Sequence, residues 1–230
     1  MSFRPAQPRG GPQIIPRPAQ WRLGGPAPWA HLTDRSLSLS QVVDALAGQD
    51  GFVVPNLPVV DHRPASVLVA LYEDQGEAHV VLTRRSPDMA SHPHQVSFPG
   101  GRQDAEDADL WATACREAHE EVDLDPALPY LVGELPPMTT IGRPSLIHPF
   151  VAVLPERPNL VANPAEVETI RHVALAELLS DEVWREEHWQ RDGQEIAITF
   201  FELPGDTIWG VTGTLLRQLL TLSLGLNPDQ

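Results

Sequence analysis

A chain of 230 residues with 31 acidic residues, 16 arginines and no lysine has a formal net charge of −15, and 42% of its residues are hydrophobic. This length and composition predict one domain with a sizeable core, and the negative charge argues against non-specific binding to nucleic acid. The absence of lysine excludes a P-loop lysine, a pyridoxal Schiff base and the lysine of protein kinases. Because the sequence has neither an apolar run of 18 residues nor a signal-peptide hydrophobic region, we expect a cytoplasmic protein with no membrane partner.

The first 30 residues are rich in proline and glycine, a composition that disfavours helices and central strands. It predicts an extended N-terminal arm, followed by a domain over residues 31–230. Trp21 and Trp29 are expected to dock this arm either on the domain or on a second subunit, and the second case would make a homodimer.

Hydrophobic periodicity predicts the elements of an α+β domain. In chain order they are a helix over 37–47 capped by Ser38 or Ser40, strands over 66–72 and 79–83 joined by a polar turn at 73–77, a helix that carries Glu117, strands over 130–135 and 147–154, a helix over 173–179, a strand over 195–202 and a helix over 212–224. No internal repeat is evident.

The predicted helix around residue 117 carries glutamates at positions i, i+3 and i+4, namely Glu117, Glu120 and Glu121. At about 100° per residue they share one sector, and an apolar sector beside it, which includes the single cysteine Cys115, faces the core. Like charges on adjacent turns repel one another, and a hard divalent cation with oxygen ligands reverses that effect. The pattern predicts a Mg²⁺ or Mn²⁺ site that acts on phosphate, with a solvated acidic face as the alternative.

Residues around this helix complete the candidate site. Gly100 and Gly101 provide a tight turn before the helix, and Arg116 can orient a carboxylate through its planar guanidinium. Four acidic residues between 104 and 109 lie near the helix start, where the macrodipole favours negative charge. An acidic protein that binds an anion depends on its few cations, and the candidates near these loops are Arg84, Arg85, Arg102 and Arg143. The alternative for each of them is a surface salt bridge.

The run 116–121 resembles the Nudix box, in which a glycine, five residues, an acid and seven residues precede Arg-Glu-x-x-Glu-Glu-x-Gly. Two departures concern the turns on either side of the helix. The spacing from Gly101 to Arg116 is one residue longer than the general pattern, and Asp123 stands where the final glycine is expected. The Arg-Glu-x-x-Glu-Glu core itself is complete.

Upstream residues resemble the extended motif of the coenzyme A pyrophosphatase branch of Nudix hydrolases, which tolerates the longer spacing. They are Leu82-Thr83-Arg84-Arg85-Ser86, then His92, then Gln95-Val96-Ser97-Phe98-Pro99-Gly100-Gly101. Further similarities at 148–151, 163–167 and 208–212 extend the resemblance over about residues 66–220, the expected domain core. The resemblance implies a Nudix-type α/β/α sandwich with a mixed sheet and a glycine turn before the catalytic helix.

The resemblance also implies divalent-metal-dependent hydrolysis of a nucleoside diphosphate-linked substrate. Coenzyme A or its thioesters would give 3′,5′-ADP and 4′-phosphopantetheine or its acyl form. One alternative is a Nudix pyrophosphatase for ADP-ribose, another nucleotide sugar or a dinucleotide. A second is a non-catalytic nucleotide-sensing module, against which the complete box argues.

The candidate residues divide into three expected groups. The metal ligands are Glu117, Glu120 and Glu121; the catalytic residues are Arg116, Glu117 and Glu166; the substrate-binding residues are Arg84, Arg85, His92, Gly100, Gly101 and Arg102. Nudix enzymes often take a base for the attacking water from a loop outside the box, which brings in Glu166 and Glu168, with Glu117 as the rival. The alternative is that both are solvated acids before the helix at 173–179. His92 either contacts phosphate or stabilises its loop.

Overall fold

The centre of the larger sheet is the hairpin of β2 (Ala65–Asp74) and β3 (Glu77–Arg85), which the sequence predicted. The structure is a computed structural model, and it describes residues 9–47, 64–139 and 146–227. A two-residue turn closes the hairpin, with Gln75 and Gly76 both at positive φ (53° and 82°), and is therefore shorter than the predicted turn. This conformation matches the right-handed twist of the strands, and glycine adopts it without steric cost.

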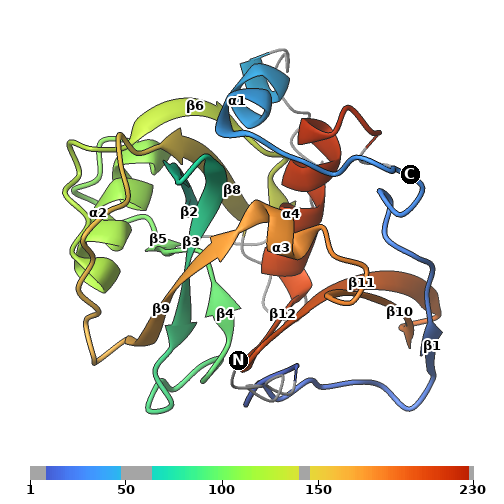
Figure 1. Cartoon of the computed structure of the whole chain (residues 1–230). Helices are drawn as coiled ribbons and strands as arrows, with labels where there is room; N and C mark the ends of the chain where they lie inside the picture. Colours follow the sequence, from blue (N-terminus) through green and yellow to red (C-terminus); the bar gives the residue numbers. More distant parts are fainter. Residues whose placement is uncertain (1–8, 48–63, 140–145, 228–230) are drawn as a thin grey trace, which may run out of the picture.

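The larger sheet is mixed, because one of its strand pairs is parallel (Figure 1). The strand parallel to β2 is β8 (Leu146–Val153), and the antiparallel strands are β4 (Val96–Ser97) and β9 (Val167–Ala174) on β3, β5 (Gly100–Arg102) on β2, and β6 (Tyr130–Glu134) and β7 (Met138–Thr139) on β8. Successive side chains of β2 alternate between two apolar clusters, so both faces of this strand are buried.

Helices cover both faces of this sheet and complete an α/β/α sandwich (Figure 1). One face carries α2 (Leu110–Val122), which packs through Ala114, Ala118 and Val122. The helices packed into the cluster on the other face are α1 (Leu39–Ala47), α3 (Leu175–Leu178) and α4 (Gly210–Ser223). The expected α+β Nudix-type sandwich with a mixed sheet is confirmed in this arrangement.

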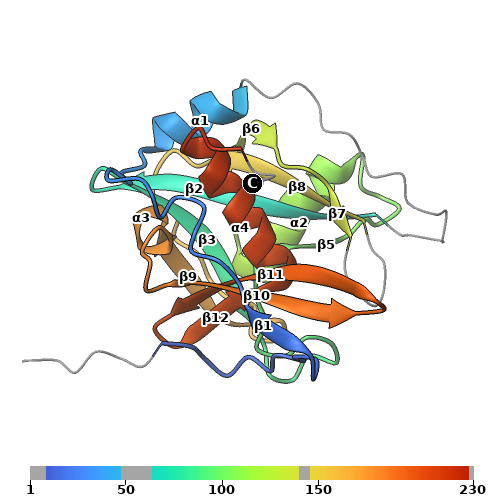
Figure 2. The same ribbon diagram turned by 90° about the vertical axis from the view of Figure 1, so that its right-hand side faces the viewer.

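A smaller antiparallel sheet packs on the side of α4 that faces away from the larger sheet (Figure 2). Its strand order is β1 (Trp21–Leu23), β10 (Trp184–Arg191), β11 (Gln194–Leu203) and β12 (Asp206–Trp209). The N-terminal arm supplies the edge strand β1, and it also supplies Trp29, which is fully buried and whose Nε1 donates a hydrogen bond to the Leu179 carbonyl oxygen at 3.0 Å. The arm therefore docks on its own chain through Trp29, whereas Trp21 remains 42% exposed.

The elements predicted at 37–47, 195–202 and 212–224 are confirmed as α1, β11 and α4. The prediction of a helix over 173–179 is wrong at its start, because residues 173 and 174 belong to β9 and only Leu175–Leu178 is helical. Strand β9 pairs with β3 up to its last residue, Ala174, and this ladder outweighs local helix propensity. Strand β10 was not predicted. Among the described residues, no helix is both long enough and apolar enough to cross a membrane.

Candidate metal and diphosphate site

Both departures from the box pattern leave the helix α2 intact. At its start, the Asp109 carboxylate accepts a hydrogen bond from the Ala112 N–H at 2.7 Å and caps the first turn. At its end, Asp123 takes the left-handed conformation (φ 57°) that the expected glycine would take, and its N–H donates to the carbonyl oxygens of Ala118 and His119. Asp is one of the few non-glycine residues that tolerate this conformation. The helix therefore presents its glutamates in the predicted register.

The glycine turn lets two strands and a carboxylate approach one another closely. A Cβ atom on Gly100 would lie 2.3 Å from the Ser66 carbonyl oxygen, and one on Gly101 would lie 2.3 Å from Oε1 of Glu117. Neither position accepts a side chain without displacement of its neighbour. Because Gly101 has no side chain, the Glu117 carboxylate has room between α2 and β5.

Glu121 is the most deeply buried acidic residue of α2, with 3% of its surface exposed. Its Oε2 atom has no hydrogen-bond partner among the described residues, while the Gly100 N–H hydrogen-bonds the carboxylate. Burial raises the pKa of Glu121 to about 8; the charge of Arg85 opposes this shift, and the charges of Glu117 and Glu166 add to it. The carboxylate therefore holds its proton near neutral pH unless a positive charge joins it.

Arg116 organises the outer part of the cluster. It forms a bidentate ion pair with Asp107 at 2.8 and 2.9 Å, and its Nη1 atom lies 3.2 Å from Oε1 of Glu117 and 3.0 Å from Oε2 of Glu120. The hydrogen bonds from Arg116 hold the pKa of Asp107 far below its usual range. Sequence reasoning missed Asp107 as the partner of Arg116, although an acid at this position was visible near the helix start.

The three predicted metal ligands share one face of α2 but do not form a closed metal cluster. Glu120, whose side chain is 49% exposed, pairs with Arg116, and among the described residues no three His, Cys, Asp or Glu side chains converge enough to hold a metal ion. The donor set nevertheless fits a hard divalent cation, because carboxylate oxygens are its preferred ligands and Glu121 Oε2 is buried without a partner. A cation bound there would stabilise the ionised carboxylate and so oppose the effect of burial on the pKa of Glu121.

Arg84 and Arg85 are adjacent on β3 and point to opposite sides of the sheet. Arg85 lies on the α2 side, where its charge acts on Glu121 and its Nε atom is buried without a partner among the described residues. Arg84 lies on the other side, 2.9 Å from Glu168 and 3.1 Å from Asp206. The structure therefore brings Arg85 to the cluster and leaves Arg84 in separate ion pairs.

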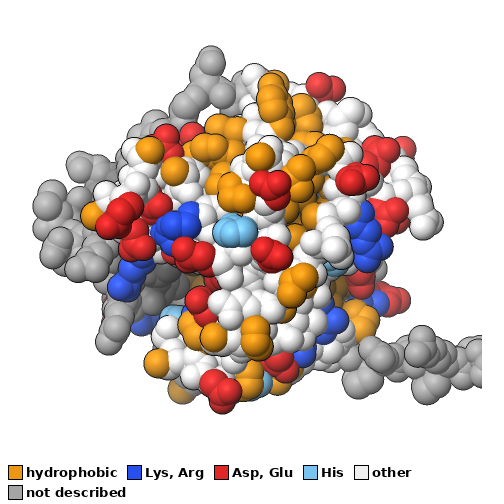
Figure 3. Space-filling model, turned by 90° about the vertical axis from the view of Figure 1, so that its left-hand side faces the viewer, with side chains coloured by type: hydrophobic (Ala, Val, Ile, Leu, Met, Phe, Trp, Pro, Cys, Tyr) orange, Lys and Arg blue, Asp and Glu red, His pale blue; other side chains and the backbone are white. Residues whose placement is uncertain are grey.

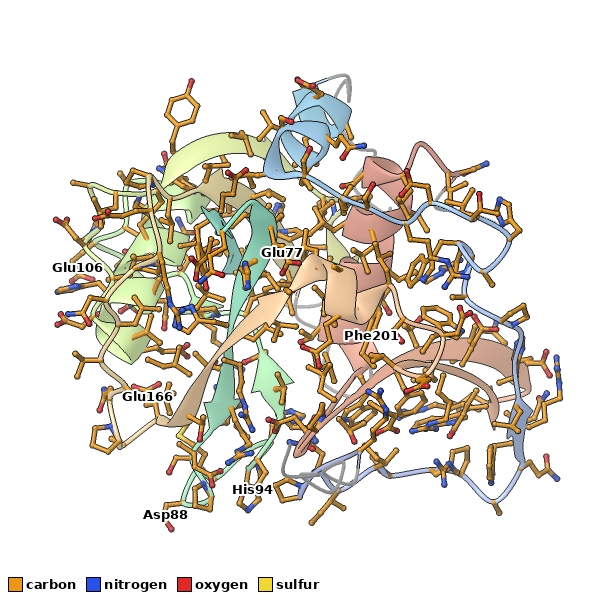
Figure 4. All side chains as sticks on the ribbon, viewed as in Figure 1. Glu77, Asp88, His94, Glu106, Glu166 and Phe201 are labelled. Atoms are coloured by element: carbon orange, nitrogen blue, oxygen red, sulfur yellow. The ribbon has the colours of Figure 1, made fainter. Side chains whose placement is uncertain are left out.

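Glu166 and Glu168 are separated in the same way. A bulge in the pairing of β3 with β9 turns Glu168 toward Arg84, whereas the charge of Glu166 raises the pKa of both Glu117 and Glu121. Glu166 lies in the turn just before β9, on the side of α2 (Figure 4). The loop before it is tied to α2, because the Asn163 N–H donates to the carbonyl oxygen of Glu121 at 2.9 Å.

The other predicted residues lie at the edge of this cluster. His92 is exposed, with φ at 55°, and the exposed Arg102 contributes its carbonyl oxygen to Arg116 at 3.1 Å. Arg143 lies outside the described residues. Cys115 is buried, and burial raises the pKa of its thiol to about 11, which agrees with a core residue rather than a nucleophile.

Charge on the α2 face of the molecule is mixed. Acidic side chains are spread across this face, and basic side chains lie beside several of them (Figure 3). Arg116 alone pairs with three carboxylates at 3.2 Å or less. An anion that approaches α2 therefore meets guanidinium groups as well as carboxylates, in spite of the net charge of −15.

Comparison with known proteins identifies the family of this chain. The NUDIX domain profile matches residues 62–194. A Photorhabdus laumondii protein described as an uncharacterized Nudix hydrolase, NudL, is 38% identical over 159 residues, 69% of this chain and 84% of that protein. The chloroplastic Nudix hydrolase 22 of Arabidopsis thaliana is 37% identical over 167 residues, 70% and 55% of the two chains.

Among solved structures, a MutT/nudix family protein from Enterococcus faecalis matches with a TM-score of 0.47 at 15% identity, over 82% of this chain and 75% of that one. The profile covers more than half of the 230 residues, and the sequence relatives exceed 30% identity over two thirds of the chain. This chain belongs to the Nudix family.

Proposed function

We propose that this chain is a divalent-metal-dependent hydrolase that cleaves the diphosphate of coenzyme A or its thioesters. The observation that carries this proposal is the buried carboxylate of Glu121, which has one unpartnered oxygen and lies among Glu117, Glu166 and Arg85. A buried carboxylate with an unpartnered oxygen is unfavourable by itself, and its donor atoms suit a divalent cation.

The upstream motif supports coenzyme A as the substrate. Residues 82–86 lie on β3 and the following loop, and residues 95–101 lead through β4 into the glycine turn. The resemblance of these residues to the coenzyme A pyrophosphatase branch therefore concerns the segments on both sides of Glu121. Arg85 has a buried Nε atom without a partner, which suits a phosphate oxygen.

The proposed reaction is the hydrolysis of one phosphoanhydride bond. The oxygen of a water attacks one phosphorus, the bond from that phosphorus to the bridging oxygen breaks, and the bridging oxygen leaves with the other phosphate. One proton of the water goes to a base and the products from coenzyme A are 3′,5′-ADP and 4′-phosphopantetheine. A divalent cation, when bound, neutralises phosphate charge and makes water a better nucleophile.

The chain's own residues have distinct parts in this proposal. Glu117, Glu120 and Glu121 would hold the cation, and Arg116 orients two of them from its bidentate contact with Asp107. Glu166 is our candidate for the base, since its charge acts on the same carboxylates from a loop outside α2. Arg85 would bind a phosphate group of the substrate.

The test is product analysis on a panel of substrates with Mg²⁺ or Mn²⁺. We expect coenzyme A to be cleaved most efficiently, with 3′,5′-ADP as a product, and ADP-ribose, NADH and diadenosine polyphosphates to be cleaved poorly. Arg85→Ala is expected to raise KM, and Arg85→Lys to have an intermediate effect because a point charge replaces the planar fork.

Each other result of the panel has a definite reading. Preferred cleavage of ADP-ribose or a dinucleotide would replace coenzyme A by that substrate and keep the metal site. Binding without cleavage of any member would indicate a nucleotide-sensing module. An unchanged KM and turnover in Arg85→Ala would remove this arginine from the site.

A further inference from the structure

Gln13 is a buried residue in a segment that otherwise lies on the surface. It is 8% exposed, while its neighbour Ile14 is 75% exposed. Its Nε2 donates hydrogen bonds to the carbonyl oxygen of His94 at 2.8 Å and to Oδ1 of Asp206 at 2.9 Å, and its Oε1 accepts one from the Thr207 N–H at 2.7 Å. Both ends of the amide are used, so neither a carboxylate nor a hydroxyl replaces it.

His94, whose carbonyl oxygen accepts a hydrogen bond from Gln13, belongs to the loop between β3 and β4, residues 86–95. His92 and His94 in this loop have left-handed backbones, with φ at 55° and 61°, a conformation that is unfavourable for residues other than glycine and persists only where the surroundings impose it. At this point the loop's own backbone hydrogen bonds run from the Arg85 N–H to Gln95 at 2.9 Å, from the His94 N–H to Arg85 at 3.2 Å and from the Gln95 N–H to His92 at 3.2 Å, and the last two are at the long end of the usual range.

The loop is joined at both ends to the candidate site. It follows Arg85, whose charge acts on Glu121, and it leads through β4 into the glycine turn beside Glu117. His94 lies at the lower end of the molecule in Figure 4, near the start of the described N-terminal arm. A change in the shape of the loop would therefore displace residues on two sides of the site.

The arm does not need Gln13 in order to dock. Arg9 pairs with Glu182 at 2.7 Å, and Arg17 pairs with Glu187 at 2.6 Å. The Gly10 N–H donates to a carbonyl oxygen of β11 at 2.9 Å. These contacts reach only the smaller sheet and the turn before it, whereas Gln13 also reaches the β3–β4 loop.

We propose that Gln13 is a positioning residue that fixes the β3–β4 loop in its substrate-binding shape, so that the N-terminal arm is a functional part of the site. The proposal rests on the proposed function for its consequence in catalysis. The fixing of the loop itself is a structural statement that can be measured without any substrate.

The experiment compares Gln13→Ala, Gln13→Glu and the control Arg9→Ala with the wild-type chain. Hydrogen exchange of peptides that cover 86–96 is measured first, and steady-state kinetics on the best substrate of the panel second. Gln13→Glu keeps an acceptor for the Thr207 N–H, but it removes the donor to His94 and places a carboxylate beside Asp206. Exchange of peptides from the arm is therefore measured alongside, to distinguish release of the loop from loss of docking.

We expect both Gln13 variants to speed exchange in the loop by about fivefold to tenfold, as the loss of one or two hydrogen bonds allows. KM should rise by a similar factor with turnover within about twofold, because the residue contacts no reacting atom. Arg9→Ala should change neither quantity, and exchange in α2 should be unaffected in all three variants.

Unchanged loop exchange in both Gln13 variants would overturn the proposal. Faster exchange with an unchanged KM would overturn the role in substrate binding. If Gln13→Ala fails to fold, Gln13→Glu decides the question alone. Failure of the wild-type chain to cleave any substrate would refute the proposed function, while the exchange data would still decide whether Gln13 holds the loop.

Discussion

Replacement of Glu121 by glutamine is expected to stabilise the metal-free protein while it abolishes activity. Burial raises the pKa of this carboxyl from 4.5 to about 8. The unfolded chain therefore ionises Glu121 above pH 4.5, whereas the folded chain does so only near pH 8. This difference destabilises the fold increasingly from pH 4.5 to pH 8 and disappears below pH 4.5, where both states are protonated.

The magnitude follows from the width of this pH window. Between pH 4.5 and pH 7, an interval of 2.5 pH units, Glu121 is ionised in the unfolded chain but protonated in the folded one. Each unit lowers the free energy of unfolding by about 1.4 kcal/mol, which gives about 3 kcal/mol at pH 7. Glutamine removes this term, and its unpaired amide N–H offsets a part of the gain. We expect Glu121→Gln to be more stable than the wild type by about 1 to 3 kcal/mol at pH 7, and to lose this advantage at pH 4.5, where only the cost of the unpaired amide remains.

Urea denaturation after removal of metal by EDTA, at pH 4.5 and pH 7, measures this difference. Glu168→Gln is the matched control: burial raises the pKa of Glu168, but hydrogen bonds from Arg84 and His94 outweigh it and lower the pKa, so this variant should lose stability near neutral pH. Turnover of Glu121→Gln should fall by orders of magnitude. A Glu121→Gln variant that is less stable than the wild type at pH 7 would refute the reasoning.

Three further predictions follow from single contacts. Gly101→Ala should lower turnover by about 100-fold, because its Cβ would displace the carboxylate of Glu117, to which we assign a part in catalysis. Gly25→Ala, which has no atom within 4 Å of the new Cβ, should retain activity. Glu166→Gln should lower turnover by about 10²-fold and alter the pH–rate profile. If its pH–rate profile is instead the same as that of the wild type and of Glu168→Gln, the base lies on α2. Trp29→Ala should destabilise the chain by about 3–5 kcal/mol in urea denaturation, since the ring is fully buried.

The sequence predicted those parts of the fold whose residues carry a periodic pattern. Helix α2 could be predicted because its apolar residues and glutamates both recur with helical spacing, and the hairpin because two β-rich runs flank a polar turn. Strand β10 could not, because five of its eight residues are charged or histidine, and Arg185, Glu187 and His188 pair with β11 or with the arm. Such pairing is a tertiary property that local propensity does not encode.

The candidate site was predicted in its residue types more than in its geometry. Spacing on α2 placed the three glutamates on one face, but it could not distinguish Arg84 from Arg85, or Glu166 from Glu168. Strand pairing makes that distinction, because alternation on β3 and a bulge in its pairing with β9 send each pair to opposite sides. The contact of Gln13 with His94 joins residues that are 81 positions apart, and no local pattern predicts it.

The central claim is that the glutamates of α2 hold the divalent cation. Titration of the metal-free protein with Mn²⁺, followed by the loss of the electron paramagnetic resonance signal of free Mn²⁺, measures this binding directly. We expect saturable binding by the wild type and by Glu168→Gln, and an increase in Kd of at least about tenfold in Glu120→Gln and Glu121→Gln. Equal Kd values in the wild type and in both α2 variants would contradict the claim.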